Sequence, residues 1–248
     1  MGINNQNKRN KGKFIIIDGP DCSGKGILFD GLQKYALEKG KKIFDLEEYT
    51  KKHEFFPEPE ELFEYDIIFS SEPTYVGIGK VLREEIIKHN SRHYSAFDTA
   101  LFYSLDRMIL YRRLIIPLLE KGKLIIQGRG ITSSVAYQPI QAEPLELDIV
   151  LGFEGNNLAI QHAPDLLVIL DAKPEFVMDR MKKRKKQDQS IFDKYEFQKN
   201  LYERYMSDWF KKLFEEHGSK VVYLDMNRTE EQEIADAINI VAPYIGRK

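Results

Sequence analysis

The sequence predicts an α/β fold with a parallel, five-stranded sheet that carries helices on both faces. Continuous apolar runs that include β-branched residues occur at Phe14 to Ile17, Leu124 to Gln127 and Leu166 to Leu170. Such runs are typical of strands that are buried on both faces. Helical patterns lie between them, and a helix is the usual crossover between two parallel strands. Ligands of such sheets bind at the carboxyl ends of the strands.

A glycine-rich loop follows the first of these strands. Gly19 and Gly24 lie five residues apart and Lys25 comes next, which fits the pattern of a phosphate-binding loop. Glycines allow backbone N–H groups and the N-terminus of the following helix to surround a polyphosphate, and the lysine adds a positive charge. The residues expected around ATP are Gly19, Pro20, Asp21, Cys22, Ser23, Gly24, Lys25, Gly26 and Ile27. A strand-to-helix turn with an incidental lysine is the alternative, and the order of strand, loop and helix makes it the weaker one.

The composition limits the classes of partner. The 37 basic and 39 acidic residues give a net charge of −2, which argues against a general electrostatic role on nucleic acid or on a membrane surface. Cys22 is the single cysteine, so the chain has no internal disulfide and suits a reducing cytosol; we expect a cytoplasmic protein. Residues 1–12 are polar and basic, unlike a signal peptide or a membrane span, and we expect a disordered tail before one domain over 13–248.

The remaining elements follow in order along the chain. Further strand signals lie at Asp66 to Ser70 and Val221 to Leu224, and Lys42 to Leu46 could form another strand. Residues 47–65 are acidic, aromatic and proline-bearing, and we interpret them as an insertion outside the sheet. Helices are predicted at Ile27 to Lys39, Ile78 to His89, Ser95 to Lys121 with a kink at Pro117, Glu146 to Leu151, after Pro174, Tyr195 to Glu216 and after Thr229.

Five segments, in this order, resemble the thymidylate kinase family of P-loop nucleoside monophosphate kinases. They are the phosphate loop with Asp21; Glu72-Pro73 followed by Gly79 and Arg83; Tyr103 with Asp106-Arg107; Arg129 with Ser133, Ser134, Ala136, Tyr137 and Gln138; and Pro164-Asp165 before the Leu166 strand. The resemblance extends over nearly all of Lys13 to Ile245. It implies the P-loop kinase fold with a lid segment at about 180–195, and commonly a homodimer.

The resemblance assigns an acceptor site for a deoxynucleoside monophosphate. Its implied members are Asp21, Glu72, Pro73, Arg83, Tyr103, Arg107, Arg129, Ser133, Ser134 and Tyr137. Asp21 would face the sugar 3′-hydroxyl, while Arg83 and Arg129 would clamp the acceptor phosphate. Tyr103 stands where the family has a phenylalanine that stacks on thymine, and a tyrosine ring can also stack.

Three further roles come from the same resemblance. Arg107 would reach a base carbonyl, and Ser134 would approach a ring nitrogen of the base. Tyr137 would crowd the 2′ position and so favour deoxyribose. If Arg107 did not follow four residues later, we would interpret Tyr103 as an aromatic core residue on one face of a helix.

A basic stretch from Arg180 to Lys186 coincides with the lid. A charge run of this kind is usually a solvated helix end. In this family, some members place a catalytic arginine in the phosphate loop and others place it in the lid, and here Cys22 occupies the loop position. The resemblance therefore points to Arg180 or Arg184 as the arginine that neutralises the transferred phosphoryl group. With Lys25 and Arg129, these are the expected catalytic residues.

Two departures from the family concern Mg²⁺, and a third adjoins them. Gly26 stands where the pattern has Ser or Thr, Gly128 replaces the aspartate before Arg129, and Gly130 replaces a tyrosine. We hypothesise that Asp18 or Glu72 supplies a replacement carboxylate through water, because both are acidic and flank the loop. Retention of Mg²⁺-dependent turnover by both Asp18→Ala and Glu72→Ala would contradict this hypothesis.

The expected activity is transfer of the γ-phosphoryl group of ATP to a deoxynucleoside monophosphate, with dTMP as the expected acceptor and ATP and Mg²⁺ as cofactors. The expected partners are small nucleotides, without nucleic acid or membrane. One alternative is a kinase for another pyrimidine nucleotide or a deoxynucleoside. Another is a nucleotide-binding regulator of the same fold with impaired catalysis, which the missing metal-site residues would suit.

Overall fold

The computed structural model describes residues 12–88, 91–92, 94–183 and 195–246, and its centre is a six-stranded parallel sheet. The strands are β1 (Lys13–Asp18), β2 (Ile43–Asp45), β3 (Ile67–Ser71), β4 (Leu124–Gly128), β5 (Leu166–Asp171) and β6 (Lys220–Asp225), in the order β2-β3-β4-β1-β5-β6. The predicted α/β class with a parallel sheet is confirmed, but the count of five strands is wrong. The additional strand is β2, three half-buried residues that pair with β3 alone at the edge of the sheet.

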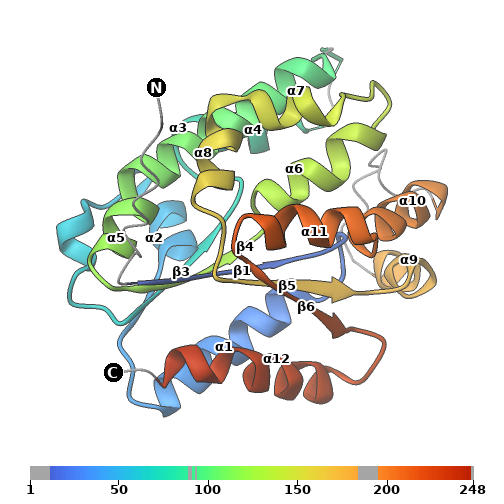
Figure 1. Ribbon diagram of the computed structural model, residues 1–248. Coiled ribbons are helices and arrows are strands. Elements are labelled where there is room, and N and C mark those ends of the chain that lie inside the picture. The colour runs from blue at the N-terminus through green and yellow to red at the C-terminus, as the bar shows by residue number, and fades with distance from the viewer. Residues whose placement is uncertain (1–11, 89–90, 93, 184–194, 247–248) are drawn as a thin grey trace.

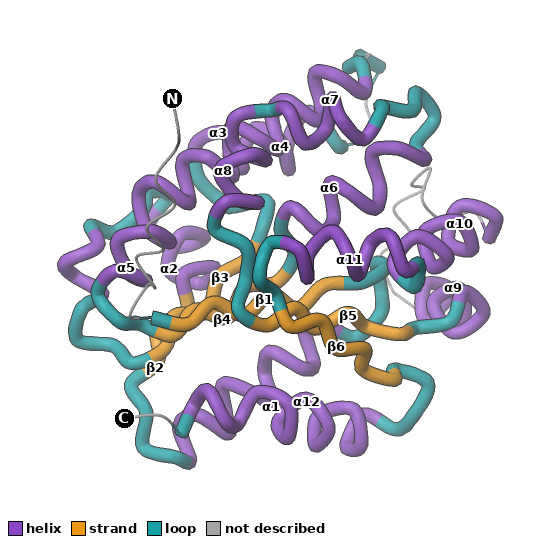
Figure 2. The backbone as a smooth tube through the Cα atoms, in the orientation of Figure 1, coloured by secondary structure: helices purple, strands orange, loops and turns teal. Residues whose placement is uncertain are grey.

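Helices cover both faces of the sheet (Figure 1). Helices α1 (Lys25–Glu38) and α12 (Glu230–Ile245) lie side by side on one face. The opposite face carries a thicker helical layer that includes α4 (Ala96–Leu110), α6 (Ile131–Tyr137), α8 (Glu154–Gln161) and α11 (Asp208–Glu216). Figure 2 shows the sheet as a band between the two layers.

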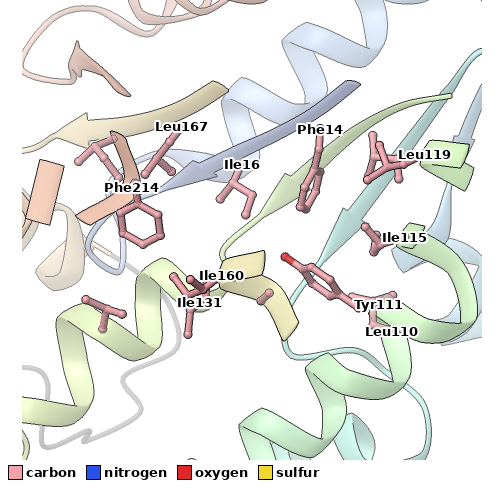
Figure 3. Packing of buried hydrophobic residues seen from close by; sticks show 14 of the residues in the cluster. Phe14, Ile16, Leu110, Tyr111, Ile115, Leu119, Ile131, Ile160, Leu167 and Phe214 are labelled. Atoms are coloured by element: carbon pink, nitrogen blue, oxygen red, sulfur yellow. The ribbon is translucent and has the colours of Figure 1, made fainter. Parts of the chain in front are cut away.

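The side chains of β1 explain why both faces must be covered. Phe14 and Ile16 belong to the core under the thicker layer, whereas Ile15 and Ile17 belong to the core under α1 and α12. All four are at most 1% exposed. Figure 3 shows Tyr111 facing Phe14, and their rings meet edge to face at 5.9 Å between centroids. The unbroken apolar run that predicted a buried strand thus contributes side chains to the hydrophobic cores on both faces of the sheet.

Two predicted long helices are each interrupted. Residues 95–121 form α4, a π-helical turn η3 (Tyr111–Ile115) and α5 (Ile116–Glu120). Pro117 is the second residue of α5, where its missing N–H is tolerated. Residues 195–216 form α10 (Tyr195–Tyr205) and α11, because the Ser207 side chain accepts the N–H of Phe210 and starts a new helix.

The remaining segments are short. They are α2 (Leu46–His53), η1 (Pro59–Leu62), α3 (Gly77–Val81), the π-turn η2 (Leu82–Ile86), η4 (Gln138–Ile140), α7 (Leu147–Gly152) and α9 (Pro174–Lys183). Residues 47–65 therefore lie outside the sheet, as predicted, and contain most of α2 and all of η1. The stretch after Gly130, for which the sequence analysis gave no helix, forms the helix α6. Most of the predicted tail and lid lies outside the described residues.

The helices α4 and α8 approach so closely that glycine is required between them. A Cβ at Gly155 would lie 1.8 Å from the carbonyl oxygen of Ser104, whose hydroxyl accepts the Gly155 N–H at 3.0 Å. We expect Gly155→Ala to lower the free energy of unfolding by about 2 kcal/mol or more. The measurement is urea denaturation followed by circular dichroism.

Gly152→Ala is the matched control, because a Cβ there meets nothing within 4 Å. Its effect should stay within about 0.5 kcal/mol. Equal effects of the two substitutions would show that the close approach of α4 and α8 does not limit stability.

Candidate active site

The glycine-rich loop joins β1 to α1 and places Lys25 at the first position of that helix. Gly24 adopts a left-handed conformation with φ of 100°, which suits glycine. The ammonium group of Lys25 is folded back onto the loop and donates to the carbonyls of Gly19 and Pro20, both at 2.7 Å. These carbonyls hold the ammonium group against the loop that precedes α1.

Opposing influences set the pKa of Lys25. Burial, reinforced by the neighbouring Arg129, lowers the pKa of Lys25 to about 7, although Asp18 and Asp21 oppose this shift. The lysine is therefore charged below this pH and largely neutral above it. An anion at the loop would restore the charge by favouring the protonated form.

Asp18, at the end of β1, is completely buried and fixes α6 against the loop. One carboxylate oxygen accepts the hydroxyls of Thr132 and Ser133, the latter at 2.7 Å. The other accepts the N–H of Gly19 at 2.8 Å. Ser133, predicted to bind the acceptor, thus supports the loop.

Arg129 follows β4 and meets the loop directly. Its guanidinium forms an ion pair with Asp21, and this carboxylate raises the pKa of Arg129 well above its usual range even though burial acts in the opposite direction. The Tyr137 hydroxyl accepts the Asp21 N–H at 3.1 Å. Three predicted site residues, Asp21 of the loop and Arg129 and Tyr137 of the segment after β4, therefore converge.

Arg83 is held by the segment that follows β3. Its Nε lies 3.1 Å from the carbonyl oxygens of Pro73 and Thr74 and donates to both. The guanidinium carbon lies 3.8 Å from the centre of the Tyr75 ring. Thr74 is fixed in turn by Asp106, which accepts its N–H at 2.8 Å and its hydroxyl at 2.6 Å.

Arg107 is buried in a polar network beneath the site. Its Nε donates to Glu72 at 2.8 Å and its Nη1 donates to Asn156. Glu72 also accepts from Gln127 at 3.0 Å. Burial raises the pKa of Glu72, and the Arg107 guanidinium opposes this shift. Arg107 is 1% exposed, so the network fixes its orientation before any ligand arrives.

Tyr103 lies on α4, one turn before Arg107, and is half-buried. The charged groups that influence its hydroxyl are Arg129, Asp21, Arg83 and Arg107, and burial raises its pKa. The tyrosine therefore lies among the predicted acceptor residues. Ser134 is buried on α6, where its hydroxyl accepts from Gln138 at 3.4 Å.

Arg180, on α9, approaches the phosphate loop beside Gly24. Its Nη1 lies 2.7 Å from the position that a Cβ on Gly24 would take. Glu233 of α12 accepts from its Nη2 at 3.1 and 3.2 Å, and its guanidinium carbon lies 4.1 Å from the centre of the Phe176 ring. Arg184, the other predicted lid arginine, lies outside the described residues.

The residues around the loop do not fit a Mg²⁺ ion that the protein ligates directly. Position 26 lacks the hydroxyl of the usual pattern. Each oxygen of Asp18 and of Glu72 already accepts a hydrogen bond from the protein. Within residues 12–88, 91–92, 94–183 and 195–246, no group of three or more His, Cys, Asp or Glu side chains could hold a metal ion.

Several supporting residues escaped the sequence analysis. Asn156, Gln127 and Glu233 hold or orient predicted site arginines or their carboxylate partners, yet each lies in a different element from its partner. No spacing pattern connects residues that are 49, 55 and 53 positions apart. Thr132 adjoins the quoted motif and was within reach of the same reasoning.

Known proteins match this chain over most of its length. A family model described as thymidylate kinase matches residues 59–238, a range that begins after the phosphate loop. A thymidylate kinase of Clostridium novyi is 28% identical over 88% of this chain and 93% of its own length. One of a Geobacillus strain is 24% identical over 95% and 98%, and a probable thymidylate kinase of Pyrococcus abyssi is 28% identical over 82% and 86%.

The pKa of Lys25 gives a prediction for phosphate binding. We expect tripolyphosphate binding at about pH 8 to take up close to one proton more in the natural protein than in Lys25→Gln, because the bound anion recharges the lysine. At about pH 6 the two proteins should differ little, since Lys25 is then already protonated. Calorimetry in buffers of different ionisation enthalpy measures the uptake. Equal uptake by the two proteins at both pH values would contradict the shifted pKa.

Proposed function

Because the chain belongs to the thymidylate kinase family, we propose that it transfers the γ-phosphoryl group of ATP to dTMP and so forms dTDP. One observation carries the proposal. Arg129, which follows β4 and is expected to hold the acceptor phosphate, is ion-paired with Asp21 of the phosphate loop. A residue expected to bind the phosphoryl acceptor thus contacts the loop expected to bind ATP. A phosphoryl transfer requires this proximity, because its catalysis consists mostly of positioning and charge neutralisation.

In the proposed reaction, an oxygen of the acceptor phosphate bonds to the γ-phosphorus of ATP. The bond between that phosphorus and the β–γ bridging oxygen breaks, and ADP leaves. Lys25 and Arg129 neutralise charge on the transferred group and its neighbours, and Arg180 is placed beside the loop to assist. We propose ATP as the donor, with Mg²⁺ accompanying it.

The proposed acceptor site lies across the ends of β3 and β4. Arg83 and Arg129 would hold the phosphate, while Tyr103 would stack on the base. Arg107 would donate a hydrogen bond to a base carbonyl through guanidinium N–H groups that do not bind Glu72 or Asn156. Pro73, Ser133, Ser134 and Tyr137 complete the proposed contacts, with Tyr137 favouring deoxyribose.

One observation favours a second acceptor. A cavity of about 530 Å³ lies between residues 54–61 and the start of α3, and its lining includes Asp106, which precedes Arg107 in the sequence and holds Thr74. The predicted insertion at 47–65 therefore borders the acceptor side. Another pyrimidine nucleotide or a deoxynucleoside is the alternative substrate. The glycines at 26 and 128 support a second alternative, a nucleotide-binding regulator without turnover.

We also propose one kinase domain over 13–248 with a lid at about 180–195, cytoplasmic and homodimeric, with nucleotides as its ligands rather than nucleic acid. The single sheet that all described strands join supports one domain. Exposed Val81, Ile87 and Ile109 are apolar surface that a second copy would cover. In the described part of the chain, the helices are too short or too polar to span a membrane.

An assay for ADP release tests the activity. We expect turnover of ATP only with an acceptor present, and faster with dTMP than with dUMP, dCMP or thymidine. A coupled enzyme assay with Mg²⁺ measures the four rates. A different preferred acceptor would identify the related kinase. Binding of ATP and dTMP by calorimetry without any turnover would instead identify the regulator and reject the kinase.

Tyr103 tests the acceptor site separately. We expect Tyr103→Ala to raise the KM for dTMP about tenfold or more, because base stacking contributes roughly 1–3 kcal/mol. Tyr103→Phe keeps the ring and should stay close to the natural KM. The KM for ATP should change little in both variants. A similar loss in both variants would assign the effect to the hydroxyl group and not to stacking.

A further inference from the structure

Two glycines face the region where a metal ion would lie beside the phosphates. Gly26 is exposed on the first turn of α1, and a Cβ there would meet nothing within 4 Å. The position therefore has room for a serine or threonine, and crowding does not explain its absence. In P-loop NTPases, Mg²⁺ is held by this hydroxyl together with a carboxylate from a neighbouring strand.

The second glycine lies at the corresponding strand end. Gly128 pairs with Ile17 of β1 and with Ser71 of β3, so it adjoins the loop. A Cβ at Gly128 would lie 3.2 Å from the ring of Phe29. Phe29 follows Gly26 by three residues on α1 and therefore shares its face of the helix. An apolar ring thus occupies the space beside Gly128.

The nearby carboxylates offer no direct substitute. Asp18 is completely buried and accepts hydrogen bonds on both oxygens, and Glu72 does so from Arg107 and Gln127. Asp21 is ion-paired with Arg129. Asp18 and Glu72 are buried and all three carboxylates are oriented by protein donors, so ligation of Mg²⁺, which prefers near-ideal octahedral oxygen geometry, would have to share or displace these contacts.

Positive charge is supplied instead by side chains. Lys25 and Arg129 lie at the loop, and Arg180 approaches it beside Gly24. Among the described residues, Nη1 of Arg180 is buried and has no hydrogen-bond partner. This nitrogen is therefore a donor that remains available to an anion at the loop.

We propose that this chain binds the triphosphate through its own cations and contributes no direct ligand to the Mg²⁺ ion. A metal ion that accompanied the triphosphate would then depend on no side chain of this chain for its retention. The inference deepens the proposed function and rests on it, because ATP is the ligand in both.

The test compares ATP binding in excess Mg²⁺ with ATP binding in EDTA, measured by calorimetry without acceptor. For the natural protein we expect Mg²⁺ to tighten ATP binding by no more than about threefold, since the metal gains no protein ligand and neutralises part of the charge that the cationic side chains attract. Gly26→Ser adds a hydroxyl in open space and should favour the magnesium complex about tenfold, which corresponds to about 1.4 kcal/mol. Gly26→Ala adds the same Cβ without the oxygen, so whatever its effect on ATP affinity, the ratio of the two Kd values should stay that of the natural protein.

Gly152→Ser is the control for a remote glycine-to-serine change, because its Cβ also meets nothing within 4 Å. Natural protein that binds ATP more than about tenfold better with Mg²⁺ would overturn the inference and leave the kinase proposal intact. An unchanged preference in Gly26→Ser would overturn it as well. Absence of ATP binding under both conditions would instead reject the proposed function, and the inference with it.

Discussion

The pairing of β1 with β4 is the constraint on which the site depends. Ile17 is in register with Gly128, and the Arg129 N–H donates to the Ile17 carbonyl at 3.1 Å. Two segments about 110 positions apart in the chain therefore leave the sheet side by side. One is the phosphate loop, and the other is the segment that begins with Arg129. The ion pair between Arg129 and Asp21 is a consequence of this register. A sheet in which another strand separated β1 from β4 could not make it.

Carboxylates organise the arginines of the site before any ligand binds. Asp21 holds Arg129, Glu72 holds Arg107 and Glu233 holds Arg180. The Arg107–Glu72 pair is buried on both sides, and removing one partner of such a pair leaves an uncompensated charge, which is strongly destabilising. The arrangement therefore ties the geometry of the site to the stability of the fold. An incoming phosphate meets guanidinium groups whose conformational entropy has already been lost, which favours binding.

The sequence was informative where local chemistry decides the outcome. The apolar run of β1 and the glycine spacing of the loop are local signals, and both elements appear where they were predicted. The strand β2 carries no such run, because it has only three residues and all of them are half-buried. The break at Ser207 depends on a side-chain cap within a helical pattern that otherwise continues.

The partners of the site residues were beyond sequence reasoning for a different reason. Asn156 and Glu233 are ordinary helical residues until the fold brings them to Arg107 and Arg180. Their roles follow from tertiary packing, which no spacing rule encodes. The resemblance named the arginines but not the groups that orient them.

The ring of Phe29 beside Gly128 bears on how the sequence can change. A single substitution at Gly26 can restore a hydroxyl, because the space there is open. An aspartate at Gly128 would instead bring its Cβ to 3.2 Å from the phenyl ring, so Phe29 has to shift by a few tenths of an ångström or become smaller. The two departures from the metal-binding pattern therefore differ in reversibility. A side chain at position 26 needs no adjustment of its surroundings, whereas a side chain at position 128 needs the Phe29 ring on α1 to move.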